Sequence, residues 1–190
     1  MKKMQMLAAL LTVCGLAACC DNAPKSFSGT IADASMNNVT VQAADADQTY
    51  TFSTMDADKS EANGLLLGAP VVVDYKGKLE NGVAATKVST DPTYAQAVGK
   101  WTMPDPIDPE GVMGIEIEVE GEARSINMAT LVYKSWELQD EAGKILLKGQ
   151  SIGNDQTIDV TQTGVIAKDA AGRYTLSIEG ESTVYTKSNE

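Results

Sequence analysis

The feature that most constrains the fold of this chain is a strict alternation of aliphatic and acidic residues from Ile115 to Glu120. Ile115, Ile117 and Val119 would face a core, and the glutamates between them would face solvent, as on a half-buried β-strand. An α-helix cannot place every second residue on one face. The segment therefore predicts a strand in which each inward side chain contributes about 1.5–3 kcal/mol if it is fully buried.

Similar short segments, separated by turn residues, recur through the C-terminal half of the chain. They are Gly99–Met103, Ile115–Glu120, Ala123–Met128, Leu131–Gln139, Lys144–Ile152, Thr157–Gln162, Tyr174–Glu179 and Thr183–Thr186. Strands spaced this evenly are typical of an antiparallel up-and-down sheet that curls into a barrel. We predict such a barrel over residues 95–187.

The N-terminal half carries five further strand-like segments, with a polar interruption after the third. They are Phe27–Ile31, Val39–Val41, Tyr50–Phe52, Val71–Tyr75 and Val83–Val88. This pattern favours a small OB-like barrel over residues 27–90, with room for one helical turn in the polar interruption, Asp56–Asn63. Asp91-Pro92 predicts a short helix between the barrels, with the carboxylate as its cap. The chain is thus expected to be all-β, with two small antiparallel barrels as its domains.

Composition excludes several function classes. The chain has 15 Lys and Arg residues against 26 Asp and Glu residues, so its net charge of −11 repels the phosphates of nucleic acids. It has no histidine, which removes the commonest general base and the commonest metal-binding imidazole. No nucleophile, phosphate-binding or zinc motif is present. We therefore expect no enzymatic activity, no cofactor and no metal. An enzyme that uses two converging carboxylates is an alternative hypothesis.

The N-terminus has the three parts of a signal peptide: a cationic start, an apolar centre and small residues before a cysteine. Leu16-Ala17-Ala18-Cys19 resembles the bacterial lipoprotein signal. The resemblance implies cleavage after residue 18 and acylation of the Cys19 thiol, and residues 19–26 would form a tether. Ordinary secretion after an Ala-x-Ala-like site is the alternative. Removing residues 1–18 takes away two lysines and changes the net charge to −13.

All three cysteines, Cys14, Cys19 and Cys20, lie in or beside this signal, so the folded body has no disulfide. Cys20 is either an inert free thiol, which we favour, or a second acylated position. Because Asp21 is the only acidic residue close to the anchor, surface export is not supported. We expect the protein in the outer membrane, facing the periplasm, and exposure on the cell surface is the alternative.

Gly99-Lys100-Trp101 is similar to the Gly-x-Trp opening of lipocalins. Three further features, Ser125–Leu131, the pair Tyr133 and Trp136, and Leu146–Gly153, resemble the lipocalin-like lipoproteins of Bacteroidota bacteria. The likeness spans about Ala95 to Lys187. It implies a small envelope β-barrel, in a family whose members mostly lack an assigned ligand. A full lipocalin is longer, and eight short strands enclose an interior that side chains can nearly fill.

Six residues of the second barrel are candidates for lining a ligand site: Trp101, Met128, Tyr133, Trp136, Asn127 and Ser151. In the lipocalin pattern the first tryptophan plugs one end of the barrel, and we favour this core role over ligand contact. Met128, Tyr133 and Trp136 form an apolar cup or simply pack. Asn127 and Ser151 either bind a ligand head group or, as is commoner for such side chains, form hydrogen bonds with backbone groups.

Two acidic groups are weighed as cation sites. Glu116, Glu118, Glu120 and Glu122 would lie about 6.5–7 Å apart along one strand face, which is too far to chelate one ion. Asp58 and its acidic neighbours lack the full calcium-loop pattern. We interpret both groups as solvated.

These observations predict a lipid-anchored envelope protein that performs no catalysis. Its second barrel is expected to bind a small apolar or amphipathic molecule in an apolar cavity near Trp101 and Trp136. Acyl chains on Cys19 are expected to attach the protein to the membrane. The alternative is an accessory protein that acts through protein contacts in an envelope complex, for which an exposed apolar patch of several hundred Å² is expected.

Overall fold

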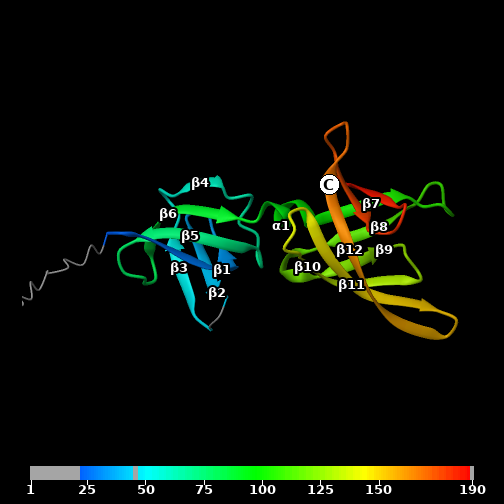
Figure 1. The fold of residues 1–190 in the computed structure, drawn as a ribbon, viewed down its shortest axis with the longest axis horizontal. Coiled ribbons are helices and arrows are strands. Elements are labelled where there is room, and N and C mark those ends of the chain that lie inside the picture. The colour runs from blue at the N-terminus through cyan, green and yellow to red at the C-terminus, as the bar shows by residue number, and fades with distance from the viewer. Residues whose placement is uncertain (1–21, 45–46, 189–190) are drawn as a thin grey trace, which may run out of the picture.

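A computed structural model describes residues 22–44 and 47–188 of the chain (Figure 1). Within these residues almost every element is a β-strand, and the strands form two sheets, which confirms the all-β prediction. Neither described range contains a helix that is long and apolar enough to cross a membrane. The predicted signal peptide, Cys19 and Cys20 lie outside the described residues.

The first sheet is built from the N-terminal half of the chain. Its strands are β1 (Pro24–Ala34), β2 (Asn38–Ala43), β3 (Thr49–Ser53), β4 (Asp58–Glu61), β5 (Pro70–Lys76) and β6 (Val83–Thr90). Their order is β3-β2-β1-β5-β6-β4, and β3 also pairs with β6 in parallel. This extra pairing closes five strands into a ring, the predicted OB-like barrel. We call it the N-terminal barrel.

Two details differ from the sequence prediction. β1 begins at Pro24, three residues before the predicted start. The polar interruption contains strand β4 rather than a helical turn. The Glu61 carboxylate lies 2.6 Å from Lys87 Nζ and accepts a 3.2 Å hydrogen bond from Ser89, so cross-strand polar contacts hold this exposed segment along β6.

A short helix, α1 (Pro92–Ala97), joins the two sheets. The Asp91 carboxylate accepts hydrogen bonds from the backbone N–H groups of Thr93 and Tyr94, at 2.7 and 3.4 Å. Pro92 occupies the first turn, where its missing N–H costs nothing. The predicted helix start is therefore confirmed.

The second sheet contains the C-terminal half. Its strands are β7 (Gly99–Pro104), β8 (Val112–Ile117), β9 (Ala123–Ile126), β10 (Leu131–Leu138), β11 (Lys144–Gly153), β12 (Gln156–Lys168), β13 (Tyr174–Ile178) and β14 (Val184–Lys187). Sequential neighbours pair antiparallel, and β14 returns to pair with β7. A bridge between Glu122 and Ser135 brings β9 and β10 together, so the sheet is a nearly closed up-and-down barrel, as predicted. We call it the C-terminal barrel.

The alternation of aliphatic and acidic residues that begins at Ile115 ends earlier in the structure than predicted. β8 stops at Ile117, and residues Val119–Gly121 form a 3₁₀ turn, closed by a 2.8 Å hydrogen bond from Glu118 N to Glu122 O. Val119 is therefore only half-buried. Gly121 has φ of 84°, a backbone conformation that favours glycine, and this explains how the turn interrupts the strand.

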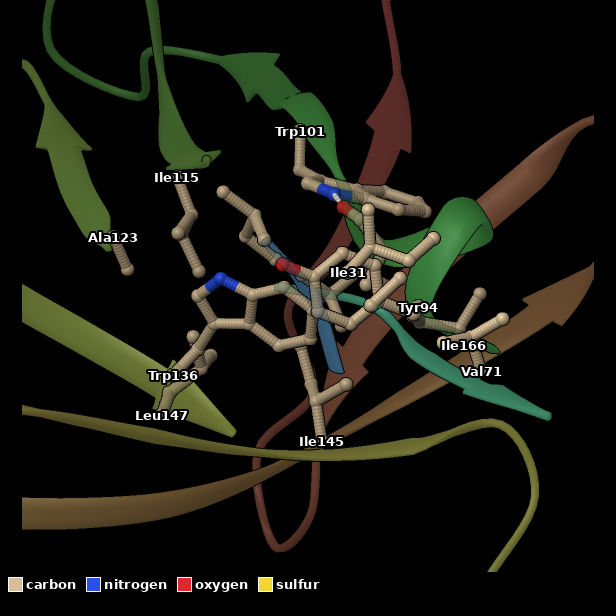
Figure 2. Packing of buried hydrophobic residues seen from close by; sticks show 14 of the residues in the cluster. Ile31, Val71, Tyr94, Trp101, Ile115, Ala123, Trp136, Ile145, Leu147 and Ile166 are labelled. Atoms are coloured by element: carbon tan, nitrogen blue, oxygen red, sulfur yellow. Dashed lines mark hydrogen bonds between the residues drawn. The ribbon is translucent and has the colours of Figure 1, made fainter. Parts of the chain in front are cut away.

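Buried residues from both barrels form one apolar cluster. Figure 2 shows Ile31 and Val71 of the N-terminal barrel near Tyr94 and Trp101, with Trp136 close by. The core is thus continuous across the junction that α1 makes.

Candidate functional site

Trp101 closes the end of the C-terminal barrel next to α1. Its side chain is 0% exposed, and the indole N–H donates a 2.7 Å hydrogen bond to Ala97 O, so its one polar group is satisfied. Lys187 Nζ lies 5.3 Å from the ring centroid and donates to Gln96 O at 2.5 Å. Burial lowers the pKa of Lys187. This arrangement fills the α1 end and leaves the indole no free edge for a ligand.

Trp136 lies at the same end. It is 3% exposed, and its indole N–H donates to Glu118 O at 2.8 Å. Its ring packs at a tilt on Tyr94, with 4.9 Å between the ring centroids. Both tryptophans are thus fixed by backbone carbonyls of their own barrel or of α1.

Tyr133 lies further along the barrel interior and is 3% exposed. Its hydroxyl donates to Gln162 Oε1 at 2.6 Å, and the Gln162 amide donates to Glu181 Oε1 at 2.6 Å. Burial strongly raises the pKa of Tyr133, so the phenol stays a neutral donor. This chain of hydrogen bonds links the interior to the far end of the barrel.

The remaining three candidates lie toward that far end. Asn127, with φ of 53°, is exposed and donates from Nδ2 to Val112 O at 2.7 Å, which ties its turn to β8. Met128 is half-buried against the core, and Ser151 is exposed. The structure therefore does not gather the six candidates around one cavity: Trp101 and Trp136 fill one end, and the other four lie on the way to the opposite end.

We call that opposite end the open end; it is where β7 finishes and β8, β10 and β12 begin. Leu131, Ser151 and Ile158 lie side by side there across β10, β11 and β12. They lie two residues along each strand from Tyr133, Gly149 and Val160, and so share the inner face with the buried Tyr133. Ile158 is nevertheless 59% exposed, and Leu131 is half-buried. Residues 151–159 are exposed on both faces, so the tip of the β11–β12 hairpin projects past the barrel and leaves its inward face open to solvent at this end (Figure 1).

A second hollow lies between the barrels and was not foreseen from the sequence. This junction groove has a volume of about 490 Å³. Its N-terminal wall includes Ile31, Gly68 and Pro70, and its C-terminal wall includes Tyr94, Glu120, Trp136, Glu137 and Leu138. Among the six candidates, only Trp136 lines it. Its residues come from loops and strands that are far apart in sequence, so no local pattern marks them.

Tyr94 connects the two walls of the junction groove. Its hydroxyl donates to Leu67 O in the N-terminal barrel at 2.7 Å and accepts from Glu120 N in the C-terminal barrel at 2.9 Å. Burial raises the pKa of Tyr94, which keeps the hydroxyl proton available for the first bond. One side chain thus spans both barrels.

Nothing in residues 22–44 or 47–188 brings three His, Cys, Asp or Glu side chains close enough to hold a metal ion. Hydrogen bonds from Ser60 lower the pKa of Asp58, and the Lys87 ammonium lowers the pKa of Glu61. Glu118 and Glu122 share Arg124, each with a 3.2 Å contact. The carboxylates of these four residues thus form hydrogen bonds or ion pairs with neighbouring side chains or backbone groups on the surface.

Two of three comparisons with known proteins found a match, and both matches cover the C-terminal barrel. A family model described as lipocalin-like matches residues 93–188, which are 96 of the 190 residues. The crystal structure of a lipocalin-like protein from Bacteroides thetaiotaomicron VPI-5482 is 42% identical over 48% of this chain and 95% of that chain, with a TM-score of 0.41. The comparison with curated proteins found no match. The match to the family model spans every strand of the C-terminal barrel, and the chain belongs to the lipocalin-like family.

Proposed function

We propose that this protein is a lipid-anchored, non-catalytic binding protein of the cell envelope, and that its C-terminal barrel takes up a small apolar or amphipathic molecule. The observation that carries the proposal is the contrast between the two ends of the barrel. Trp101 is 0% exposed at the α1 end, whereas Ile158, on the inward face of the hairpin that projects at the open end (Figure 1), is 59% exposed. A ligand would therefore enter at the open end.

The side chains around this entrance suit a molecule with an apolar body and a polar head. Leu131, Met128 and Ile158 offer apolar surface, whose burial stabilises a complex by roughly 25 cal/mol per Å². Ser151 lies on the same inward face and provides a hydroxyl group, whereas the Gln162 amide is already bonded to Tyr133 and Glu181. A few placed polar groups in an apolar site are typical of small-molecule binding.

A pair of variants on one hairpin tests this proposal. Ile158→Glu places a charge on the inner wall, and we expect it to weaken binding of a fluorescent medium-chain fatty acid roughly 10- to 100-fold, the worth of one buried aliphatic side chain. Ile152→Glu adds the same charge on the outer face of the hairpin, where Ile152 is 43% exposed, and should leave binding unchanged. Fluorescence titration measures both. Equal binding by the two variants, or none by the unaltered protein, would refute the proposal.

A second candidate function, docking of an envelope protein, is favoured by the apolar side chains on the outside of the open end. Ile107 is 91% exposed, Val184 52% and Val112 46%. Such side chains suit a protein contact. Crosslinking in intact envelopes distinguishes the two functions: Ile107→Glu should abolish a crosslinked product while leaving fatty-acid binding intact, and recovery of no product from the unaltered protein counts against docking.

The anchor and the location complete the proposal. Acyl chains on Cys19 would hold the protein to the outer membrane, with both barrels in the periplasm. The acidic body, at −13 after removal of residues 1–18, offers no electrostatic attraction to anionic lipids. Membrane attachment would therefore depend on the acyl chains.

A further inference from the structure

We propose that the junction groove is a second binding site, which takes a small amphipathic cation: an amine carried on an apolar body. The site is separate from the open end, so the proposal does not rest on the function proposed above. Its volume of about 490 Å³ lies within the range of roughly 300–1,000 Å³ that small-molecule sites occupy. Boundaries between folded units are also where such sites commonly occur.

The walls of the groove supply the apolar part of the site. Ile31 and Pro70 lie on one side, and Leu138 and Trp136 lie on the other. Ile31 and Trp136 are only 2% and 3% exposed, so the half-buried Pro70 and Leu138 present most of the apolar surface. The aromatic ring of Trp136 is held in place by its hydrogen bond to Glu118 O and by its contact with Tyr94. A ligand with a short alkyl or aromatic body would contact surfaces that are already ordered, which reduces the entropy lost on binding.

The charge of the groove selects the polar part of the ligand. Glu120 and Glu137 are the charged residues of its lining, and both are acidic. Glu137 is paired with Lys148 at 2.8 Å, but within the described residues no cationic side chain pairs with the Glu120 carboxylate. An ammonium group would supply the missing positive charge, whereas a carboxylate or phosphate would be repelled.

The backbone around Glu120 is positioned by both barrels. Glu120 has φ of 61°, a conformation uncommon outside glycine, and its N–H donates to the Tyr94 hydroxyl. Gly68 of the N-terminal barrel packs directly against it. A Cβ atom on Gly68 would lie 2.9 Å from Glu120 Cα and 2.7 Å from Tyr94 Oη, closer than real contacts allow. The two walls thus meet at a contact that only glycine permits, and this contact sets the position of the Glu120 backbone.

Octylamine, with octanoate as its matched anion, tests the proposal by isothermal titration calorimetry on the purified protein. We expect saturable binding of octylamine and much weaker binding of octanoate. Glu120→Gln keeps the shape of the side chain and should weaken octylamine binding roughly tenfold, about the contribution of one charge-assisted hydrogen bond. Glu110→Gln removes the same charge from an exposed loop at the open end and should change nothing.

A second pair of variants tests the geometry. Gly68→Ala should push the two walls of the groove apart and weaken octylamine binding, whereas Gly64→Ala should leave binding unchanged. Both glycines have positive φ, 77° and 100°, but a Cβ on Gly64 would meet its nearest neighbour, Leu66, at an ordinary 3.6 Å. If Gly68→Ala fails to fold, Glu120→Gln still decides the question.

Several results would overturn the inference. They are absence of octylamine binding, equal binding of octanoate, and unchanged octylamine binding in Glu120→Gln. Loss of octylamine binding in Ile158→Glu but not in Glu120→Gln would move the amine to the open end, which supports the function proposed above and refutes this site.

Discussion

Trp101→Ala is expected to destabilise the protein by about 3–5 kcal/mol, the usual cost of deleting a large buried aromatic side chain. The side chain is fully buried, and its loss would open a cavity at the α1 end of the barrel and leave Ala97 O without its donor. Lys187 would also lose the ring against which its ammonium group packs. Because a domain is stable by only about 5–15 kcal/mol in total, the loss is large. Urea unfolding followed by circular dichroism measures it.

Two control variants make this result specific. Trp101→Phe keeps an aromatic ring but removes the indole N–H, so we expect a smaller loss, which includes the 0.5–1.5 kcal/mol or so of one hydrogen bond. Ile107→Ala changes an apolar side chain that is 91% exposed, and should alter the free energy of unfolding by less than about 0.5 kcal/mol. A loss below about 1 kcal/mol for Trp101→Ala would contradict a core role for this residue.

Cys19→Ser is expected to move the protein entirely from the membrane fraction to the soluble fraction. The thiol would be the acceptor of the acyl chains, and each buried CH₂ of such a chain contributes about 0.8 kcal/mol to membrane binding. A serine hydroxyl does not replace the thiol, and the acidic body supplies no other attraction to lipid. Incorporation of radiolabelled palmitate, together with fractionation of cells that make the protein, measures the effect.

Cys20→Ser provides the matched control, since it removes the neighbouring thiol and leaves Cys19 in place. We expect this variant to keep its palmitate label and to stay in the membrane fraction. Label that persists in Cys19→Ser, or an unaltered protein that takes up none, would show that the lipoprotein interpretation of the N-terminus is wrong.

The strands of the C-terminal barrel could be predicted because their alternation is local. Each segment between Gly99 and Lys187 shows its inward and outward faces over a few residues, and antiparallel neighbours need only a turn between them. The closing of the N-terminal barrel by the parallel pairing of β3 and β6 depends on residues about 30 positions apart, Phe52 and Val83. The strand count suggested an OB-like barrel, but no local pattern identified this pairing.

The two places where the predicted strands differ from the observed ones, at β4 and near Val119, have specific physical causes. β4 has no apolar alternation, because all four of its residues are exposed and it is held by polar contacts of Glu61. The alternation continues in sequence to Glu120, although the strand ends at Ile117 and the backbone turns over Val119–Gly121. Periodicity reports which face a side chain would occupy in a strand, but it does not report whether the strand continues.

The candidate ligand residues were chosen by type, and type alone could not separate packing from binding. Trp101 and Tyr133 are aromatic, but both are buried with their polar groups satisfied. Ile158 was not selected, because a single aliphatic residue in a strand carries no signal of exposure. Glu120 was noted only as part of an acidic row, and its place in the junction groove depends on Gly68, some fifty positions earlier.

The bonds that Tyr94 makes to both barrels would have a consequence for the orientation of the molecule if acyl chains anchor it to a membrane. In Figure 1 the chain enters at one extremity of the long axis, and the β11–β12 hairpin projects from the other. A bridging phenol that joins the two bodies would stop them from folding back on each other. With acyl chains at the start of the chain, the N-terminal barrel would lie next to the membrane, and the proposed ligand entrance at the far extremity would face the aqueous space rather than the bilayer.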